Sequence, residues 1–521
     1  MKRLIFIFFI LTTYSQACEW KDNIPCITVY PNSNKLDFKI QPTNTVTQKE
    51  IKTFNLITLN KVLNFVNGTN AVQSGPIGQT SSLFLRGTNS NHTLVLLNGI
   101  PINDFSSPTG QFDFGQDFMY NVSMIQVYKG ASASKFGADA IGGAVNIITT
   151  SNYETTLTTT DKSINGNYYK NINNWDINVQ GGRYKDKDKS ALAGGTDKDS
   201  VDNKSIAINV NKWFNNINFK TVLFSRSNFA NIDGHSLAVQ NGYSNNDFYA
   251  FQTGADYVTK DYTNYITLHT HEYNRRYESN KYKASNYFFK IGHQANTYGL
   301  GLDYKFEESL LHDDDNVSLF ANYNYNIFSF GARKDSDNDT YSIGLFKNLT
   351  ESLDIRANHS TGYKKKTIWT AEEDSKTNEV SLDYNNYTLS LFESETGIQN
   401  QDGIELSYKK NNFNIFVSHL NSKKNGVVQL RRPKWKTGFN HILNINKFNV
   451  ITDYSFIGES YDIHNSNWST IKMKELHLLN LGVEKNGFTF NINNLLNENY
   501  QMPHGFTGED RQFTIGYNKK F

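Results

Sequence analysis

Hydrophobic and polar positions follow three different patterns along the chain. Residues 4–11 form one short apolar run directly after Lys2 and Arg3. Within residues 46–150, apolar positions have helical spacing in one place and form short runs elsewhere. From about residue 151 to the end, apolar and polar residues alternate with a period of two, as at Ile206, Ile208 and Val210. This last pattern is typical of β-strands whose two faces meet different surroundings.

The first apolar run predicts a secretory signal peptide over residues 1–17. It has a basic start, a short apolar centre and the small residues Ser15 and Ala17 at the cleavage point. Export leads to an oxidising compartment, where the only two cysteines, Cys18 and Cys26, can form a disulfide across a short loop. A lipoprotein acylated on Cys18 is the weaker alternative.

Residues 46–150 are predicted to form a small α+β domain. Thr47 and Glu50 have the spacing of a capping box, and Thr58 precedes an apolar helical face that ends before Gly68. Short apolar runs at 82–87, 93–102, 124–130 and 143–149 predict the strands of a compact mixed sheet.

Residues 151–521 are predicted to form an all-β transmembrane barrel of about 22 antiparallel strands. Aromatic residues make up 14% of the chain although the mean hydropathy is only -0.56, and a barrel strand needs apolar residues only at every second position. With 22 strands there are about 17 residues for each strand and its share of the loops, although 16 strands also fit. A soluble β-sandwich is the alternative, because it has the same alternation.

Several classes of function are disfavoured by the composition and by the absence of motifs. A net charge of +2 gives no support to nucleic-acid binding. No thiolate zinc pattern, nucleophile–base arrangement or phosphate-binding loop occurs in the sequence, so we expect neither catalysis nor a cofactor.

Two long motifs identify a family resemblance. GQTSSLFLRGTNSNHTLVLLNGIPIND at 78–104 and IQVYKGASASKFGADAIGGAVNIIT at 125–149 resemble the plug domain of TonB-dependent outer-membrane transporters. The first motif, together with LRRPK at 430–434, is most similar to the cobalamin branch, and NINNLLNENY at 491–500 resembles the family's final hairpin.

The resemblance implies the domain organisation and the partners. Residues 46–150 would be a plug inside the lumen of a barrel formed by 151–521, and residues 18–45 a periplasmic segment. Its Ile27, Thr28, Val29 and Tyr30 would be the TonB box, which pairs with TonB by strand addition. The protein would be a monomer in the outer membrane of a Gram-negative bacterium and draw energy from TonB with ExbB and ExbD.

The resemblance also implies that the outer plug loops bind the ligand. The matching side chains are mostly neutral: Ser74, Gln79, Thr80, Ser81, Asn103, Asp104, Phe105 and Thr109. This mixture suits a large polar organic ligand, so the first expectation is import of cobalamin or a related corrinoid. The alternatives are a siderophore or haem receptor of the same family and, from another class, an uncoupled porin-like channel or a binding receptor.

Two cations of the predicted plug require acidic partners. Arg86 and Lys129 lie at the ends of predicted strands and would face the barrel wall, where an unpaired charge is costly. In the family such pairs hold the plug. Here Gln126 stands where a glutamate is usual and Lys129 where an arginine is usual, and Lys cannot form the bidentate contacts of Arg. The alternative is a contribution to plug stability alone, without gating.

A group of carboxylates predicts a calcium site. Asp197, Asp199 and Asp202 lie within a short segment of an expected outer loop, and oxygen ligands suit calcium. The resemblance to the cobalamin branch adds Asp233 and Asp247. The alternative is a solvated turn.

His269 and His271 lie on one side of a predicted strand. One interpretation is that they bind a metal ion or haem. The other, which is more common for two histidines, is that they lie at the surface.

Overall fold

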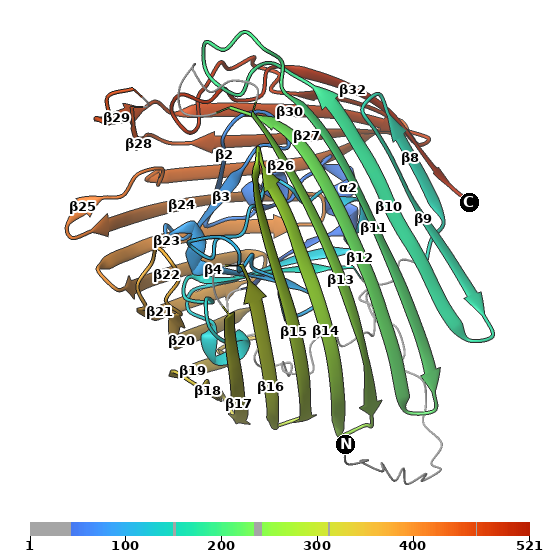
Figure 1. The fold of residues 1–521 in the computed structure, drawn as a ribbon, viewed down its shortest axis with the longest axis vertical. Helices are drawn as coiled ribbons and strands as arrows, with labels where there is room; N and C mark the ends of the chain where they lie inside the picture. Colours follow the sequence, from blue (N-terminus) through green and yellow to red (C-terminus); the bar gives the residue numbers. More distant parts are fainter. Residues whose placement is uncertain (1–42, 150–152, 234–241, 311–312, 465) are drawn as a thin grey trace.

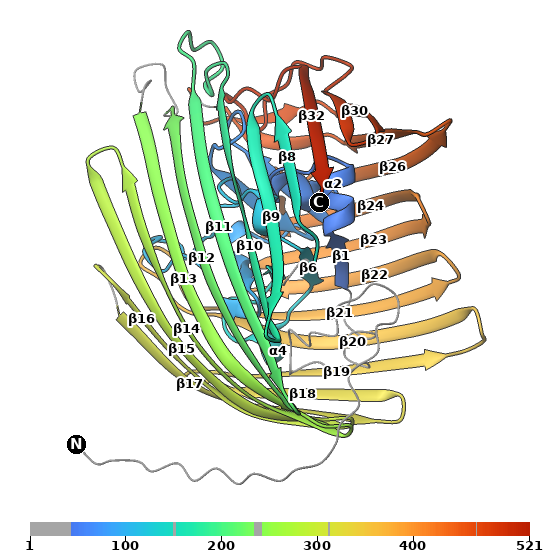
Figure 2. The same cartoon turned by 90° about the vertical axis from the view of Figure 1, so that its right-hand side faces the viewer.

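The structure, a computed structural model, describes residues 43–149, 153–233, 242–310, 313–464 and 466–521. The predicted signal peptide, the two cysteines and the stretch at 27–30 lie outside these residues. An N-terminal plug domain lies inside a closed β-barrel (Figures 1 and 2). The predicted fold class is confirmed.

The plug is built on a five-stranded mixed sheet in the order β1-β6-β7-β4-β5. Its strands are β1 (Thr43–Thr47), β4 (Thr93–Leu97), β5 (Ile100–Pro101), β6 (Met124–Lys129) and β7 (Gly143–Ile148). The β4–β7 pair is parallel and the other pairs are antiparallel. A separate hairpin consists of β2 (Thr69–Gln73) and β3 (Ser81–Leu85). The apolar runs predicted β3 to β7, whereas β1 and β2 are too polar to be recognised.

Short helices complete the plug: α2 (Gln48–Thr53), α3 (Leu59–Asn64), α4 (Ala133–Phe136), and the 3-10 turns η1 (Ser90–His92) and η2 (Met119–Asn121). The capping box of Thr47 and Glu50 is present at the start of α2. Thr58 caps α3, which buries Leu59, Val62 and Leu63 as its apolar face predicts. Local capping rules therefore placed both helices correctly.

The barrel has 22 antiparallel strands and closes through pairing of its last strand with its first. The first half is β8 (Thr156–Thr160), β9 (Ser163–Ile172), β10 (Trp175–Lys187), β11 (Ser200–Phe214), β12 (Ile217–Ile232), β13 (Gly242–Val258), β14 (Tyr262–Tyr277), β15 (Asn280–Ala295), β16 (Tyr298–Ser309), β17 (Asp313–Tyr325) and β18 (Phe328–Lys334). The second half is β19 (Asp339–Asn348), β20 (Leu353–Lys364), β21 (Glu373–Tyr384), β22 (Tyr387–Thr396), β23 (Gln399–Lys410), β24 (Phe413–Lys424), β26 (Trp435–Ile445), β27 (Phe448–Ile457), β30 (Leu476–Lys485), β31 (Phe488–Asn493) and β32 (Gln512–Lys520). Three short strands lie in connections: β25 (Val427–Val428), β28 (Ser460–Ile463) and β29 (Thr470–Met473).

The two rims of the barrel differ in their connections. At the short-turn rim, tight turns join the strands, and an asparagine with positive φ starts many of them: Asn173, Asn215, Asn326, Asn385, Asn411, Asn446 and Asn486. Asparagine tolerates this conformation, and such turns match the twist of hairpins. The opposite, long-loop rim has the larger connections 188–199, 365–372, 425–434, 458–475 and 494–511.

The outward face of the barrel is apolar and the inward face is polar. On β14, for example, Ile266 and Leu268 are exposed on the outside, whereas Thr267 and His269 are buried inside. Exposed large apolar residues recur at alternate positions on the other strands, which is the pattern of a lipid-facing barrel. None of the described helices has the length and apolar character needed to cross a membrane.

The hydrophobic core of the plug continues into one side of the barrel wall. Plug residues such as Phe112 and Phe114 belong to the same buried cluster as Phe224 of β12, Phe248 of β13 and Tyr273 of β14. The Tyr273 hydroxyl donates to the Ile102 carbonyl at 2.7 Å. The plug is therefore packed firmly against β12–β14.

Candidate functional site

The two outer plug loops lie within the long-loop rim, but several of their predicted ligand-binding side chains hold the loops together instead. Gln79 is buried and donates to the Asn231 carbonyl of β12. Ser81 is buried and accepts a hydrogen bond from Asn60. Asn103 binds Val95, Thr93 and Gly110. These three residues shape the plug surface rather than contribute free polar groups.

The remaining predicted ligand residues differ in accessibility. Thr80 is exposed, and Ser74, Phe105 and Thr109 are half-buried. Asp104 is buried and accepts from Ser106. The accessible polar surface of the outer plug is thus smaller than the sequence indicated.

The barrel wall adds a cation to this surface. Arg275 of β14 points inward, with Nη1 3.3 Å from Oδ2 of Asp104 and its guanidinium 4.9 Å from the ring centre of Tyr282. Sequence reasoning found no cation in the plug loops, because Arg275 lies far from them in the chain. The strand alternation predicts its inward direction but not its height in the lumen.

A barrel loop rests directly on the outer plug. The Pro108 carbonyl accepts hydrogen bonds from Thr367 Oγ1 at 2.9 Å and from the Trp369 amide at 3.1 Å. Beside these contacts, Ile368 and Trp369 are 49% and 75% exposed. Sequence reasoning missed this pair. Two large apolar residues within the charged segment KKKTIWTAEE were the signal available.

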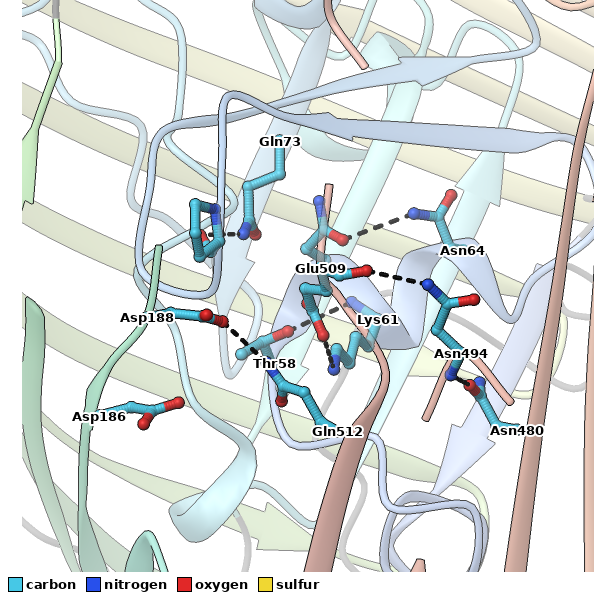
Figure 3. A network of polar contacts seen from close by, with 12 residues as sticks. Thr58, Lys61, Asn64, Gln73, Asp186, Asp188, Asn480, Asn494, Glu509 and Gln512 are labelled. Carbon is cyan, nitrogen blue, oxygen red and sulfur yellow. Dashed lines mark hydrogen bonds and ion pairs between the residues drawn. The ribbon is translucent and has the colours of Figure 1, made fainter. Parts of the chain in front are cut away.

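Two other loops of the long-loop rim, 188–199 and 494–511, pack against each other. Ala193 donates from its amide to the Gly505 carbonyl, and Thr507 Oγ1 donates to the Ser190 carbonyl at 2.7 Å. These contacts hold loop 188–199 against loop 494–511. Lys61 of α3 reaches Glu509 in the same loop at 2.9 Å, as Figure 3 shows.

Three of the five predicted calcium ligands come together. One carboxylate oxygen from each of Asp197, Asp199 and Asp233 lies within 4.8 Å of the others. Asp199 Oδ2 accepts from the Ala191 amide and Asp233 Oδ2 from Ser190, whereas Oδ1 of each has no hydrogen-bond partner in the described part of the chain. Burial, with Asp233 and Asp197 nearby, raises the pKa of Asp199 to about 6. Buried carboxylate oxygens without partners fit a hard divalent cation.

The other two predicted calcium ligands lie apart from this cluster. Asp202 is on the outward face of β11, where its carboxylate forms an exposed ion pair with Arg183. Asp247 lies within β13 beside Asn245, which donates to it. Because neighbouring residues of a strand face opposite sides, proximity in sequence did not bring Asp202 to the cluster.

The plug is held to the wall by a buried group of four charged side chains. Arg86 Nη1 lies 2.8 Å from Glu379 of β21, and Nε lies 2.9 Å from Glu405 of β23. Lys129 Nζ lies 2.6 Å from the second oxygen of Glu405. All four side chains are at most 5% exposed. Two cations and two carboxylates balance, so this interface needs no further counter-ion.

A second buried pair anchors the opposite side of the plug. Arg226 of β12 contacts Asp117, with Nη1 2.5 Å from Oδ2, and both are buried. In this region burial raises the pKa of Asp117, and the charge of Arg226 opposes that effect. The plug therefore has an ionic contact on each of two sides of the wall.

The interface between α4 and strands β17–β20 is less tightly packed. A cavity of about 60 Å³ lies there, lined largely by small polar residues and glycines: Ser132, Ser134, Asn322, Ser329, Gly331, Ser342, Gly344, Asn358 and Ser360. Ser134 and Ser342 are hydrogen-bonded across it at 3.1 Å. Small side chains give few van der Waals contacts, so α4 packs loosely against the wall around this cavity.

His269 and His271 do not lie at the surface. Both are buried on the inward face of β14, with Nε2 of His269 3.1 Å from Nδ1 of His271. His271 packs against Phe248 and Tyr273. The expectation of a surface position is therefore wrong, because the lumen at this height is filled by the plug.

Comparison with known proteins supports the same architecture. Residues 37–144 match the TonB-dependent Receptor Plug Domain. Solved structures are similar over nearly the whole chain. For the Pseudomonas aeruginosa receptor FpvA bound to a ferric pyoverdine, the TM-score is 0.78 at 11% identity, covering 94% of this chain and 87% of that one. For the ferric yersiniabactin uptake receptor of Yersinia pestis, the TM-score is 0.74 at 13% identity, covering 93% and 98%.

A third similar structure is the siderophore receptor PiuA from Acinetobacter baumannii. Its TM-score is 0.73 at 13% identity, and the match covers 95% of this chain and 98% of that chain. At these identities the similarity concerns the fold.

Proposed function

We propose that this plugged barrel is a TonB-dependent receptor that binds a scarce nutrient outside the cell and imports it through the outer membrane of a Gram-negative bacterium. The observation that carries the proposal is a plug that matches the TonB-dependent receptor plug family and is held inside a closed barrel by buried ion pairs. A permanently open porin-like channel fits less well, because the plug occupies the lumen. TonB, with ExbB and ExbD, is the proposed partner of residues 27–30.

We infer that the ligand is a ferric siderophore. Trp369 offers an exposed ring beside the outer plug, and the guanidinium of Arg275, which pairs with Asp104, contacts the same plug loop from the wall. A flat aromatic face and a guanidinium suit an anionic iron chelate that contains aromatic groups. The structures compared above include receptors for pyoverdine and yersiniabactin, which agrees with this inference.

A corrinoid is the second candidate ligand. The motif at 78–104 and LRRPK at 430–434 support it through their resemblance to the cobalamin branch. The neutral Ser74, Thr80 and Thr109 on the accessible outer plug would suit the amides of such a ligand.

We also infer that Asp197, Asp199 and Asp233 hold a calcium ion that ties loop 188–199 to the end of β12. Calcium takes six to eight oxygen ligands, so backbone carbonyls and water would complete the shell. The role of the ion would be structural, because the cluster lies in the packed part of the mouth.

Equilibrium binding to the purified protein tests the choice of ligand. Tryptophan fluorescence would be titrated with ferric catecholate, phenolate and hydroxamate siderophores, haem and cobalamin, each with calcium and with chelator. Saturable binding of one ferric siderophore and none of cobalamin supports the first candidate, and the reverse result replaces it with the second.

Uptake in cells tests the energy coupling separately. Deletion of residues 27–30 should abolish import of the bound ligand while its affinity for the purified protein stays unchanged, because the segment lies before the plug. Uptake that survives this deletion would favour an uncoupled channel or receptor.

A further inference from the structure

Four lysines form an arc on the outside of the barrel near the short-turn rim. They are Lys170 of β9, Lys212 of β11, Lys485 of β30 and Lys519 of β32. Strands β27, β30, β31, β32, β8, β9, β10 and β11 are consecutive neighbours in the closed barrel, so the lysine arc occupies one continuous part of the wall (Figure 2).

Strand alternation places all four lysines on the lipid-facing side. Lys212 shares its strand face with Ile206 and Phe214, which are 44% and 48% exposed. Lys519 shares its face with Ile515, which is 65% exposed, and Lys485 with Val483. The ammonium groups thus end among apolar side chains at the rim.

Aromatic rings accompany three of the four ammonium groups. Lys212 Nζ lies 4.4 Å from the ring centres of both Trp175 and Phe214. Lys485 Nζ lies 4.0 Å from the ring centre of Phe448, and Lys519 Nζ 4.7 Å from that of Phe521. Ring faces attract a cation and hold it at a fixed height, yet they leave its positive charge without a counter-ion.

Carboxylates in the same part of the barrel face the inside. Glu154 binds Lys520, Asp176 accepts from Tyr169, and Glu484 accepts from Asn449. Asp176, Glu484 and Lys520, the partner of Glu154, lie on the inward side of the wall by strand alternation. Throughout the residues that the structure describes, none of the four arc lysines forms an ion pair with a side-chain carboxylate.

Three outward cations at the long-loop rim are paired with carboxylates. Arg183 pairs with Asp202 at 2.5 Å, Lys283 with Glu272 at 2.9 Å and Lys334 with Asp339 at 3.1 Å. Each of these cations carries its own carboxylate. These three charges are compensated, unlike the charges of the lysine arc.

We propose that the lysine arc binds the headgroup phosphates of anionic glycerophospholipids in the leaflet at the short-turn rim. Long lysine side chains at a membrane boundary extend toward the headgroups, and an anionic leaflet attracts each of them. The rings hold three of the ammonium groups near the rim. The proposal rests on the membrane location of the barrel, but not on its ligand or on energy coupling.

Lipid selectivity of the reconstituted full-length protein tests this proposal. The association of spin-labelled phosphatidylglycerol and phosphatidylcholine with the barrel would be compared by electron paramagnetic resonance in phosphatidylcholine vesicles. We expect a preference for phosphatidylglycerol of about threefold at low salt, which falls toward one in 1 M NaCl as the charges are screened.

Two variants that each remove three cations separate the arc from general surface charge. Lys170→Gln, Lys212→Gln and Lys519→Gln together should abolish the preference. Arg183→Gln, Lys283→Gln and Lys334→Gln together should leave it unchanged, because those cations are already compensated. The shift in electrophoretic mobility between folded and heated barrel verifies folding, and Lys212→Gln alone replaces the triple variant if the latter does not fold.

Three results would overturn the proposal: no preference in the unaltered protein, a preference that persists in the arc variant, or an equal loss in the control variant. None of these measurements uses a nutrient ligand or TonB. A negative result in the uptake experiments would therefore not affect the lipid proposal. A negative result in the lipid experiments would likewise not affect the proposed transport function.

Discussion

Arg86 and Glu405 face each other across the boundary between plug and wall, with Nε 2.9 Å from Oε1. Glu405 also accepts from Lys129, so one wall carboxylate contacts two different plug strand ends. Movement of the plug would have to break both contacts at once. This pairing is the natural first target for mutation.

Replacement of Arg86 by alanine should loosen the plug without preventing barrel assembly. The change leaves Glu379 without its guanidinium and removes one partner of Glu405, and removal of one partner of a buried pair typically costs about 3–5 kcal/mol. Hydrogen exchange of the plug strands should accelerate, and cells should admit large antibiotics that the barrel normally excludes.

Arg183→Ala is the matched control for this prediction, because its pair with Asp202 is exposed and exposed ion pairs contribute little to stability. Unchanged exchange in the Arg86 variant, or equal acceleration in both variants, would show that the buried group does not hold the plug.

A disulfide across the cavity beside α4 should stop import. A Cβ on Gly331 would lie 3.9 Å from Cβ of Ser134, which is within the range for a disulfide. In a chain with Cys18 and Cys26 replaced by serine, Ser134→Cys with Gly331→Cys should bind ligand normally but import it only after reduction. The two single variants are the controls. Normal uptake by the oxidised protein would mean that this side of the plug does not move.

Trp369→Ala should weaken ligand binding. The ring is exposed at the mouth and its backbone is held by Pro108, so the substitution removes contact area without releasing the loop. We expect the dissociation constant to rise about tenfold, equivalent to ~1.4 kcal/mol. Isothermal titration gives the constant, and Trp435→Ala on the outward face is the control. Equal affinities in the two variants would remove Trp369 from the site.

Asp199→Asn should weaken calcium binding by at least about tenfold, or ~1.4 kcal/mol, because it removes a buried charged ligand. Asp202→Asn, which changes a carboxylate outside the cluster, should have no effect. Calcium titration followed by the thermal transition of the protein compares them. A transition that does not respond to calcium or chelator would exclude the site.

Calcium affinity at this cluster should also depend on pH. Because the pKa of Asp199 in the folded protein is raised to about 6, its carboxyl is protonated below that pH and must lose the proton to bind the ion. Without calcium, the proton on Asp199 stabilises the folded protein, and this stabilisation is lost as pH rises through 6. Calcium should therefore raise the transition temperature more at pH 7.5, where the carboxylate is free of its proton, than at pH 5. An equal effect at both pH values would contradict this.

The plug was predictable because its signals are local. Thr47 and Glu50 cap a helix three residues apart, and the apolar runs coincide with β3 to β7. The wall partners of Arg86 were not predictable, because Glu379 and Glu405 lie 293 and 319 residues away in the chain. Alternation assigns both glutamates to one face of a strand but leaves open which of many strands passes the plug at that point.

The candidate site was predicted only in part for a similar reason. The sequence located the outer plug loops and the aspartate-rich loop, yet it could not distinguish Gln79, which is buried in a hydrogen bond, from the exposed Thr80 beside it. Arg275 and Trp369 come from the barrel, and they lie beside the outer plug loop only because the barrel closes around the plug. Their position beside the candidate ligand site could therefore be found only from the three-dimensional structure.

Pairing of β32 with β8, in which Gly516 lies opposite Thr160, joins the end of the chain to the beginning of the wall. Until this last hairpin is made, both strands present unpaired backbone groups that invite aggregation. Contacts between such distant parts of a chain also form slowly. A protein that lacks β32 would thus keep two open strand edges, so the barrel cannot close before this strand is in place.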